Sequence, residues 1–407
     1  MQNEFIESVL TFLKAPEVGY ILLIFFLFIV PRILQRFRLP SAITSFALGI
    51  AAGMGLNIFQ HDETIALLAT LGIVSLFLHA GLDVSVSELR RNSRVLIYHL
   101  IFLLLLLVVG SIVVAKVFEL SMRVSILITL ALATPSTGFI LDSIKAFGLS
   151  DDERNWIKTK AISAELLALA GMFLTLQSLT AEKFLISMGV MLALALLIPF
   201  FFRFFASKIV PYAPNSEFAF LIMLAIACAF VTRKIGVYYL VGAFVVGVAA
   251  TSFKQKLPSV ASDRLLHSVE LFASFFVPFY FFKSGTSLTA SDFSLNAWLL
   301  AGAFIVIMVP ARLAVVVAHR RFALKESVRE GLRVAFPMLP TLIFTLVLAQ
   351  ILREQFALGN ELFGGLVIYA VATSLMTGFV FRTPQPDFES ELIEHSASSV
   401  TPTKSEG

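Results

Sequence analysis

The chain has 407 residues, of which 58% are hydrophobic and only 14% charged, and its formal net charge is +4. Its mean hydropathy of +0.90 excludes a soluble globular domain, which needs far more polar residues to cover its surface. Leu, Ile, Val, Ala and Phe fill many apolar runs of about 20 residues, the length that crosses ~30 Å of hydrocarbon as a helix. The composition therefore predicts an all-α polytopic membrane protein that lies in a lipid bilayer.

Charged or proline-rich breaks divide the chain into thirteen predicted transmembrane helices. They start near residues 19, 40, 64, 95, 122, 153, 182, 215, 236, 264, 295, 327 and 357. With the N-terminus outside, most of the 31 Lys and Arg residues, Lys158 and Lys160 among them, fall in cytoplasmic connections. The odd number of spans then places the C-terminus in the cytoplasm.

Two of these spans contain prolines that break a helix. Pro135 interrupts the fifth span, and Pro337 and Pro340 interrupt the twelfth. Each proline removes a helical hydrogen bond and frees backbone groups that lipid cannot satisfy, so both breaks must face protein or water. One such proline alone would be read as a tolerated kink, but two at equivalent positions indicate a functional pair.

The two halves of the chain repeat the same landmarks. Residues 49–53 are echoed by residues 247–251, and Gly81 has a counterpart in Gly285. Because seven spans separate equivalent helices, the two halves have opposite orientations. We therefore expect a transmembrane domain at 19–381, with repeats at about 19–178 and 215–381 and a linker helix at about 182–205. An interfacial segment at 1–18 precedes it, and a disordered cytosolic tail at 382–407 follows. Paired broken helices in inverted repeats predict a substrate site at the bilayer midplane of a secondary transporter.

A single acidic residue, Glu165, lies in the middle of the sixth span. A carboxylate at that depth costs several kcal/mol unless it is protonated, paired or hydrated, and it is therefore a functional hypothesis by default.

Several short segments resemble the cation:proton antiporter superfamily. They include Leu39-Pro40-Ser41, Gly81-Leu82-Asp83 and the stretch from Pro278 to Gly285. Individually weak, they occur in the order and spacing typical of the branch that contains bacterial sodium/proton exchangers and the membrane part of potassium efflux systems. The resemblance covers about residues 19–381. It implies a homodimer in the plasma membrane, the inner membrane of a bacterium, that exchanges Na⁺ or K⁺ for H⁺.

The resemblance also indicates which residues form the ion-binding site. Glu165 stands where relatives carry an Asn-Asp, Asp-Asp or Gln-Asp pair, but this chain has Ala164-Glu165, and an acidic residue common in the fifth helix is missing. One carboxylate is then expected to bind the proton and the cation in turn. Trading one proton for one monovalent cation moves no net charge, so electroneutral exchange is expected. Further oxygen ligands are predicted at Thr134, Ser136, Thr137 and Ser163.

Arg312 matches the position where relatives carry a basic residue that pairs with the ion-site carboxylates or braces the helix crossing. As a permanent cation it would hold Glu165 ionised in the empty site and could not itself carry the proton. The alternative is that Arg312 snorkels to the cytoplasmic interface.

Two other functions fit the same architecture. One is an organic-anion transporter that uses the positive ends of the half-helices, and the other is a membrane sensor that has lost turnover. The sequence has no nucleotide-binding motif and no metal-ligand cluster, so neither an enzyme, a cofactor nor a nucleic-acid partner is predicted.

Overall fold

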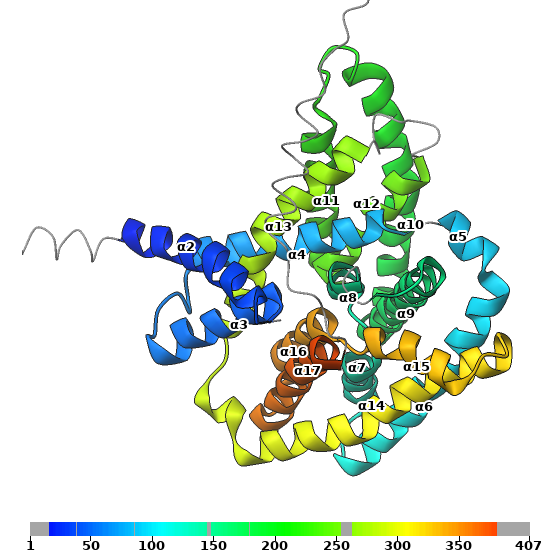
Figure 1. Cartoon of the computed structure of the whole chain (residues 1–407). Coiled ribbons are helices and arrows are strands. Elements are labelled where there is room, and N and C mark those ends of the chain that lie inside the picture. Colours follow the sequence, from blue (N-terminus) through cyan, green and yellow to red (C-terminus); the bar gives the residue numbers. More distant parts are fainter. Residues whose placement is uncertain are drawn as a thin grey trace, which may run out of the picture.

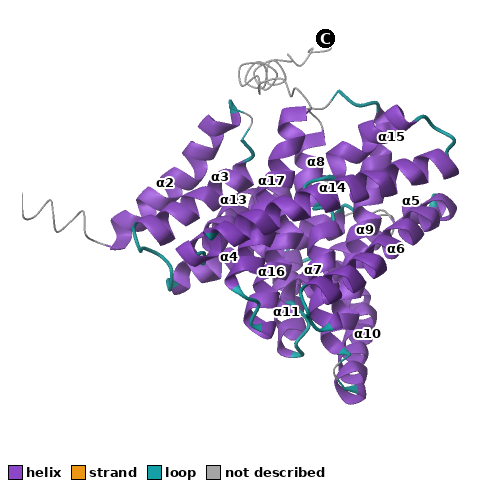
Figure 2. Ribbon diagram, turned by 90° about the horizontal axis from the view of Figure 1, so that it is seen from below, coloured by secondary structure: helices purple, strands orange, loops and turns teal. Residues whose placement is uncertain are grey.

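The computed structural model describes residues 16–37, 39–84, 86–144, 148–178, 180–253 and 263–380. Throughout these ranges the regular structure is helical, and no strand is present (Figure 2). The all-α prediction is therefore confirmed. Most of the expected interfacial segment at 1–18 and all of the expected tail at 382–407 lie outside the described residues.

The helices follow one another with short connections. In chain order they are α2 (Pro16–Gln35), α3 (Ser41–Ile50), η1 (Ala51–Gly55), α4 (Glu63–Leu82), α5 (Val86–Arg91), α6 (Ser93–Val117), α7 (Met122–Ala133), α8 (Thr137–Ile144), α9 (Asp151–Gln177), α10 (Ala181–Phe204), η2 (Phe205–Ile209), α11 (Glu217–Lys234), α12 (Tyr239–Phe253), α13 (Asp263–Thr286), η4 (Ala290–Phe293), α14 (Leu295–Ala323), α15 (Val328–Ala335), η5 (Phe336–Met338), α16 (Leu342–Phe356) and α17 (Asn360–Val380).

Every one of the thirteen predicted segments contains a helix. Within the described ranges, nine helices are long and apolar enough to cross a membrane, and a bent pair, α15 with η5 and α16, makes a tenth candidate. Two shorter apolar helices, at Ser41–Gly55 and Leu240–Thr251, fall below that length. A multi-pass membrane protein is confirmed, while the count of thirteen crossings stays a prediction.

One group of helices, which we call the scaffold, consists of α3, α4, α12 and α13, drawn in blue and green in Figure 1. Glycines let its backbones touch. A Cβ on Gly81 of α4 would lie 2.3 Å from the carbonyl oxygen of Phe244 on α12. A Cβ on Gly285 of α13 would lie 2.2 Å from that of Phe46 on α3. Such close approach of helices through small residues is typical of membrane proteins.

These two crossings are counterparts in the predicted repeats, with α4 equivalent to α13 and α3 to α12. Gly247 of α12 contacts α4 in return, and Gly49 of α3 contacts α13 in return. The sequence landmarks at Gly81, Gly285, Gly49 and Gly247 therefore mark the same pair of contacts in each half. This is the arrangement expected of two inverted repeats.

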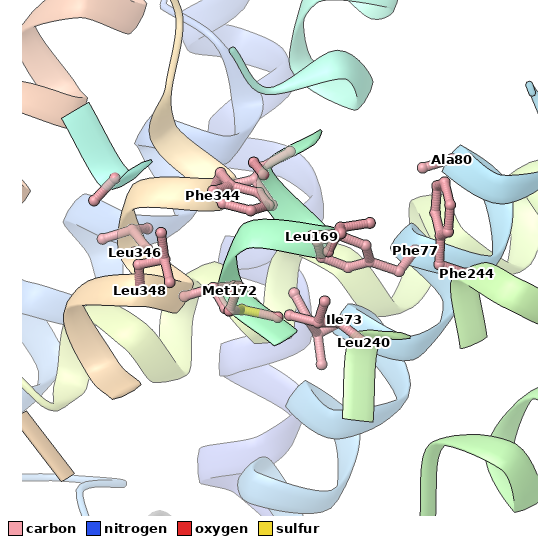
Figure 3. Close-up of a cluster of buried hydrophobic side chains, with 14 of the residues drawn as sticks. Ile73, Phe77, Ala80, Leu169, Met172, Leu240, Phe244, Phe344, Leu346 and Leu348 are labelled. Atoms are coloured by element: carbon pink, nitrogen blue, oxygen red, sulfur yellow. The ribbon is translucent and has the colours of Figure 1, made fainter. Parts of the chain in front are cut away.

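The second group of helices, which we call the crossing bundle, contains α6, α7, α8, α9, α14, α15, α16 and α17. A continuous apolar core joins it to the scaffold (Figure 3). Phe77 of α4 and Phe244 of α12 lie on the scaffold side, and Leu169 of α9 and Phe344 of α16 lie on the other. The core thus fixes α9, which carries Glu165, between the two groups.

One prediction about charge is wrong. Lys160, counted from the sequence among cytoplasmic connections, lies within α9 and is fully buried. It lies nine residues after the start of that helix, between α6 and α14, whereas Lys158 on the same helix is 36% exposed and pairs with Asp83 at 3.6 Å. Helical periodicity explains the difference, because residues two apart face nearly opposite sides of a helix.

Candidate functional site

Both predicted breaks are present, and they lie side by side. The fifth span ends its first helix, α7, at Ala133 and resumes as α8 at Thr137. The twelfth span passes from α15 through one 3₁₀ turn that contains Pro337, stops at Leu339, and resumes as α16 at Leu342, with a bend of 53°. The breaks are thus confirmed at Pro135 and at Pro340, the residues that cannot donate a helical hydrogen bond.

The two breaks satisfy each other's backbone. The N–H of Ser136 donates to the carbonyl of Pro340 over 2.8 Å. In return the Ser136 hydroxyl accepts from the N–H groups of Ile343 and Phe344, at 3.0 and 3.3 Å, in the first turn of α16. Ser136 therefore caps the opposite half-helix. With two donors on its oxygen, it has little capacity left to coordinate a cation.

The C-terminal end of α7 is capped by two side chains from α16 and α17. The hydroxyl of Thr345 donates to the carbonyl of Ala131 over 2.7 Å, and the hydroxyl of Tyr369 donates to that of Leu132 over 2.8 Å. Proline had left these carbonyls without helical donors. Both caps are fully buried, so the substitute bonds are made in the absence of bulk water.

Arg312 performs the same task for the other broken span. Its Nη1 donates to the carbonyl of Leu339 over 2.8 Å, and its Nη2 donates to that of Met338 over 2.7 Å. Nη1 also reaches the Tyr369 hydroxyl at 3.2 Å. The side chain is 6% exposed, so the snorkelling alternative is wrong. Within the described part of the chain no ion pair joins Arg312 to Glu165. Arg312 instead stabilises the helix crossing through its bonds to the broken span.

Glu165 lies on α9, facing the first break. Its side chain is 5% exposed, and its electrostatic surroundings include the backbone and side chain of Thr137, the first residue of α8. No ion pair of Glu165 is present in the described ranges. A carboxyl group is thus held out of water beside unwound backbone and without a permanent cation on it.

The other predicted ligands divide into two kinds. Thr134, at the end of α7, and Thr137 are both buried at the break, and the Thr137 hydroxyl has no hydrogen-bond partner in the described chain. Ser163 instead donates its hydroxyl to the carbonyl of Lys160 over 2.9 Å, the local bond that serines in helices often make. The structure therefore brings Glu165 together with Thr137, while Ser136 and Ser163 are already engaged.

A small cavity adjoins this site. Its volume is about 20 Å³, and its lining includes Pro135, Ala164, Arg312, Met338 and His99. Since one water needs about 10–15 Å³ of such space, the cavity has room for one. In the described ranges no group of three or more His, Cys, Asp and Glu side chains forms a transition-metal site.

Sequence reasoning missed several residues of this region. Tyr369 and Thr345 give no sequence signal, because a hydroxyl in an apolar helix usually bonds to its own backbone. Lys160 could have been found, since a lysine nine residues into a long helix lies beyond easy reach of water. His99 and His319 lie in apolar spans, where an ionisable side chain is itself a signal.

The fold and the site together define a secondary transporter, not an enzyme, with one buried carboxyl group beside two crossed, broken helices. A family model described as "Sodium/hydrogen exchanger, transmembrane" matches residues 22–384. The chain belongs to this family.

Individual relatives agree with this assignment. The chain is 25% identical to "Probable Na(+)/H(+) antiporter 3" of Methanocaldococcus jannaschii over 394 residues, which cover 89% of this chain and 95% of the relative. It is 22% identical to "Probable Na(+)/H(+) antiporter GerT" of Bacillus cereus over 287 residues, which cover 67% and 72%.

The same fold occurs in a solved structure. The sodium proton antiporter MjNhaP1 from Methanocaldococcus jannaschii, determined at pH 8, superposes with a TM-score of 0.67 at 15% sequence identity. The superposition covers 90% of this chain and 95% of that protein. A map of the same antiporter obtained by electron microscopy gives a TM-score of 0.65. At such low identity the likeness concerns the fold alone.

Proposed function

We propose that this protein exchanges a monovalent cation, Na⁺ or K⁺, for H⁺, and that Glu165 carries each in turn. The observation that carries the proposal is the position of Glu165, a buried carboxyl group without an ion pair in the described chain, next to the break between α7 and α8. The relatives' names, which refer to Na⁺/H⁺ antiporters, favour Na⁺. K⁺ stays in the proposal because this chain has Ala164-Glu165 where the family resemblance leads us to expect an Asn-Asp, Asp-Asp or Gln-Asp pair.

Competition for one carboxyl group couples the two ions. A bare carboxylate is costly away from water, and either a proton or a cation neutralises it. If the site moves between the two sides of the membrane only when neutralised, each proton carried one way requires one cation carried the other. One charge then replaces one charge, so we propose that exchange is electroneutral.

The threonines at the break complete the proposed cation site. A hard alkali ion prefers oxygen ligands, and Thr134 and Thr137 lie at the two ends of the unwound segment beside Glu165. The Thr137 hydroxyl has no other partner in the described ranges, so binding a cation there would not break a hydrogen bond. Ser136 and Ser163 contribute by holding the backbone around the site.

Arg312 supports this function through the backbone and through charge. Its donors are already used on the carbonyls of Met338 and Leu339 and on the Tyr369 hydroxyl. The organic-anion alternative would use the positive ends of the half-helices, and at α16 two of those N–H groups already donate to the Ser136 hydroxyl, which weighs against it. As a permanent cation, Arg312 is also proposed to favour the ionised form of Glu165 in the empty site.

The test is proton flux in lipid vesicles that contain purified protein and a pH-sensitive dye. Adding Na⁺, K⁺ or Li⁺ outside should drive protons out of acid-loaded vesicles with the wild-type protein, and Glu165→Gln should abolish the flux. Glu182→Gln, on an exposed acid at the start of α10, is the matched control and should exchange normally. Wild-type flux from Glu165→Gln, or no cation response at all, would contradict the proposal.

The pH dependence has a definite sign. As pH falls, protons occupy Glu165 and exclude the cation, so the apparent cation affinity should fall about tenfold per pH unit below the midpoint. Flux at saturating cation should be insensitive to membrane voltage if exchange is electroneutral. A current that reverses with voltage would show that exchange moves net charge and would rule out the one-for-one stoichiometry.

The setting of the protein in the cell is also part of the proposal. We place it in the plasma membrane, the inner membrane of a bacterium, with the N-terminus outside and the C-terminus in the cytoplasm, as the distribution of basic residues predicts. We further propose a homodimer. Cross-linking in native membranes and labelling of single cysteines at each connection would test both points.

A further inference from the structure

Three titratable side chains pack together where α6, α9 and α14 meet, and the exchange mechanism above does not use them. They are Lys160 of α9, His319 of α14 and His99 of α6, and we call them the Lys–His cluster. Lys160 and His319 have no exposed surface, and His99 is 2% exposed. Ionisable groups buried at this depth are costly, so their presence requires an explanation.

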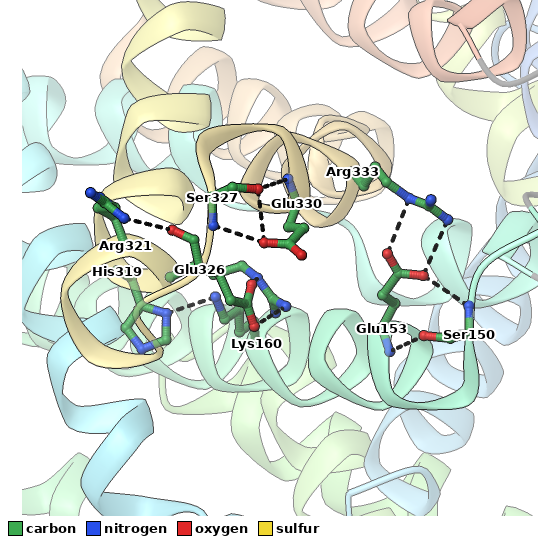
Figure 4. A network of polar contacts seen from close by, with 10 residues as sticks. Ser150, Glu153, Lys160, His319, Arg321, Glu326, Ser327, Glu330 and Arg333 are labelled. Carbon is green, nitrogen blue, oxygen red and sulfur yellow. Dashed lines mark hydrogen bonds and ion pairs between the residues drawn. The ribbon is translucent and has the colours of Figure 1, made fainter.

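Lys160 and His319 make a direct hydrogen bond. The Lys160 Nζ lies 2.7 Å from His319 Nδ1 (Figure 4). Nε2 of the same ring lies 2.9 Å from the carbonyl oxygen of Val95. A carbonyl only accepts, so Nε2 carries the ring hydrogen and Nδ1 accepts from the lysine. One proton is therefore shared between Nζ and Nδ1.

The charge on this pair is not balanced by an acid. Among the described residues, the charged groups that act on Lys160 are Arg320 and Glu326. Glu326 is committed to Arg320, whose Nε and Nη2 donate to its two oxygens at 2.5 and 2.7 Å. Lys160 has only an imidazole as its partner. A buried ammonium held in this way can give up its proton at a modest cost compared with one held by a carboxylate.

His99 extends the cluster toward the ion site. Its ring lies 5.5 Å from the ring of His319, and neither of its nitrogens has a hydrogen-bond partner in the described chain. It lines the 20 Å³ cavity together with Ala164, the neighbour of Glu165, and with Arg312. A water in that cavity would give His99 the partner that it otherwise lacks.

The two charged groups that act on Lys160, Arg320 and Glu326, line a pocket that opens to the surface. This pocket has a volume of about 590 Å³ and is lined by Arg320, Glu326, Glu153 and Arg333 among others. Figure 4 shows Lys160 and His319 beside Glu326, next to the Glu153–Arg333 ion pair. A proton taken up from this pocket would pass Glu326 and Arg320 to reach Lys160 and would not have to cross the lipid.

We propose that the Lys–His cluster is a second proton-binding site, which takes one proton from the surface pocket and shares it between Lys160 and His319. On binding, water in the pocket gives up a proton and the pair gains one positive charge; release reverses both changes. The groups that face the pair are His99 on α6, Arg320 on α14 and Glu326 between α14 and α15. Its effect on transport rests on the proposed role of Glu165.

The link to Glu165 is electrostatic. Lys160 precedes Glu165 by five residues on α9, a rise of about 7.5 Å. The same five residues also turn the two side chains by about 140° around the helix axis, so the charges act on each other through the protein and not by contact. A positive charge on Lys160 favours the ionised carboxylate and therefore lets the cation compete at lower pH. The cluster would thus set the pH range in which exchange operates.

The first experiment measures the cluster without transport. Full-length protein with ¹⁵N-labelled histidine is placed in lipid nanodiscs and titrated by NMR. We expect the Nδ1 signal of His319 to follow a pH transition that Lys160→Met removes or moves by about one pH unit. His267, which is exposed and lies on α13, serves as an internal reference. A His319 titration identical in wild type and Lys160→Met would overturn the proposal.

The second experiment measures the pH profile of exchange. Lys160→Met should move the half-maximal pH upward by about one unit. Lys158→Met removes the same charge two residues away on the exposed side of α9 and should leave the profile unchanged. An unchanged profile in Lys160→Met would also overturn the proposal.

A conservative variant, His319→Gln, tests the cluster with a smaller risk of misfolding. In His319→Gln the amide can still accept from Lys160 and donate to Val95, but it cannot take up the proton. A shift of the pH profile in this variant supports proton binding, and a wild-type profile shows that His319 only positions Lys160. If the wild-type protein shows no exchange, the proposed function fails, while the NMR titration still decides whether the cluster binds a proton.

Discussion

The scaffold and the crossing bundle are held together by different means. In the scaffold, glycines such as Gly81 and Gly247 allow whole backbones to touch, and most of the contact is van der Waals packing, with a hydrogen bond of 2.7 Å from the Thr251 hydroxyl to the Leu82 carbonyl. In the crossing bundle, prolines open the helices, and side chains such as Ser136 and Arg312 supply the missing hydrogen bonds. The scaffold contacts therefore depend on the absence of a side chain. The crossing-bundle contacts depend instead on the presence of particular hydrogen-bonding side chains.

The largest effect should come from enlarging a scaffold glycine. In Gly81→Ala the new Cβ would lie 2.3 Å from the carbonyl oxygen of Phe244, so α4 and α12 must separate. We expect a loss of about 1–3 kcal/mol or more. Thermal unfolding in detergent measures it. Gly302→Ala, on α14 where no atom lies within 4 Å, is the control and should be neutral or stabilising. If the two variants were equally stable, close backbone contact through glycine would not distinguish the scaffold from the crossing bundle.

An effect of comparable size should come from Arg312. Arg312→Met leaves the carbonyls of Met338 and Leu339 without their donors, at about 1–3 kcal/mol for each unsatisfied group. We expect both lower stability and at least a tenfold loss of exchange, about 1.4 kcal/mol in free energy. Arg312→Lys keeps the charge but not the fork of donors, and it should retain part of the exchange. If Arg312→Lys exchanged as fast as the wild type, the positive charge at this position would matter, and the hydrogen bonds to the Met338 and Leu339 carbonyls would not.

Ser136→Ala sharpens the comparison within the crossing bundle. It removes the acceptor for the N–H groups of Ile343 and Phe344, so the first turn of α16 loses its cap, at about 1–2 kcal/mol. Ser163→Ala removes a hydroxyl that bonds only to the carbonyl of its own helix and should cost little. Stability and exchange are measured for both. A larger effect at Ser163 would point to a ligand role that its hydrogen bond does not reveal.

The smallest effect is expected from Tyr369→Phe. This change removes the donor to the Leu132 carbonyl and the contact with Arg312 but keeps the ring, at about 1 kcal/mol. Tyr98→Phe, on the exposed side of α6, is the matched control. We expect a modest fall in exchange for Tyr369→Phe and none for the control. An unaltered Tyr369 variant would mean that Thr345 caps α7 sufficiently by itself.

Much of the fold could be predicted because apolar length and proline act locally. A run of apolar residues becomes a helix in lipid whatever its neighbours are, and Pro135 and Pro340 break helices by removing a donor. The pairing of Gly81 with Gly285 indicated the repeat for the same reason, since both positions need the same close contact. Glu165 stood out because an acid is rare in such surroundings.

The parts that could not be predicted depend on which side of a helix a residue faces. Lys160 and Lys158 are two residues apart in sequence, yet one is buried beside His319 and the other is exposed. Likewise, Thr137 and Ser136 are neighbours, but Ser136 caps α16 while the Thr137 hydroxyl stays without a partner in the described chain. A membrane helix that is apolar on nearly every side can turn about its own axis without changing the sequence pattern, so only packing against its neighbours fixes these rotations.

The sequence by itself determined that this chain is a bundle of membrane helices with two breaks and a buried acid, and it predicted two related halves. Those properties follow from hydrocarbon thickness, from the missing proline donor and from the cost of a buried charge. Only the tertiary structure decided that Arg312 binds the carbonyls of Met338 and Leu339 and that Lys160 meets His319. These partners lie far apart in the chain, and packing alone brings their hydrogen-bonding groups together.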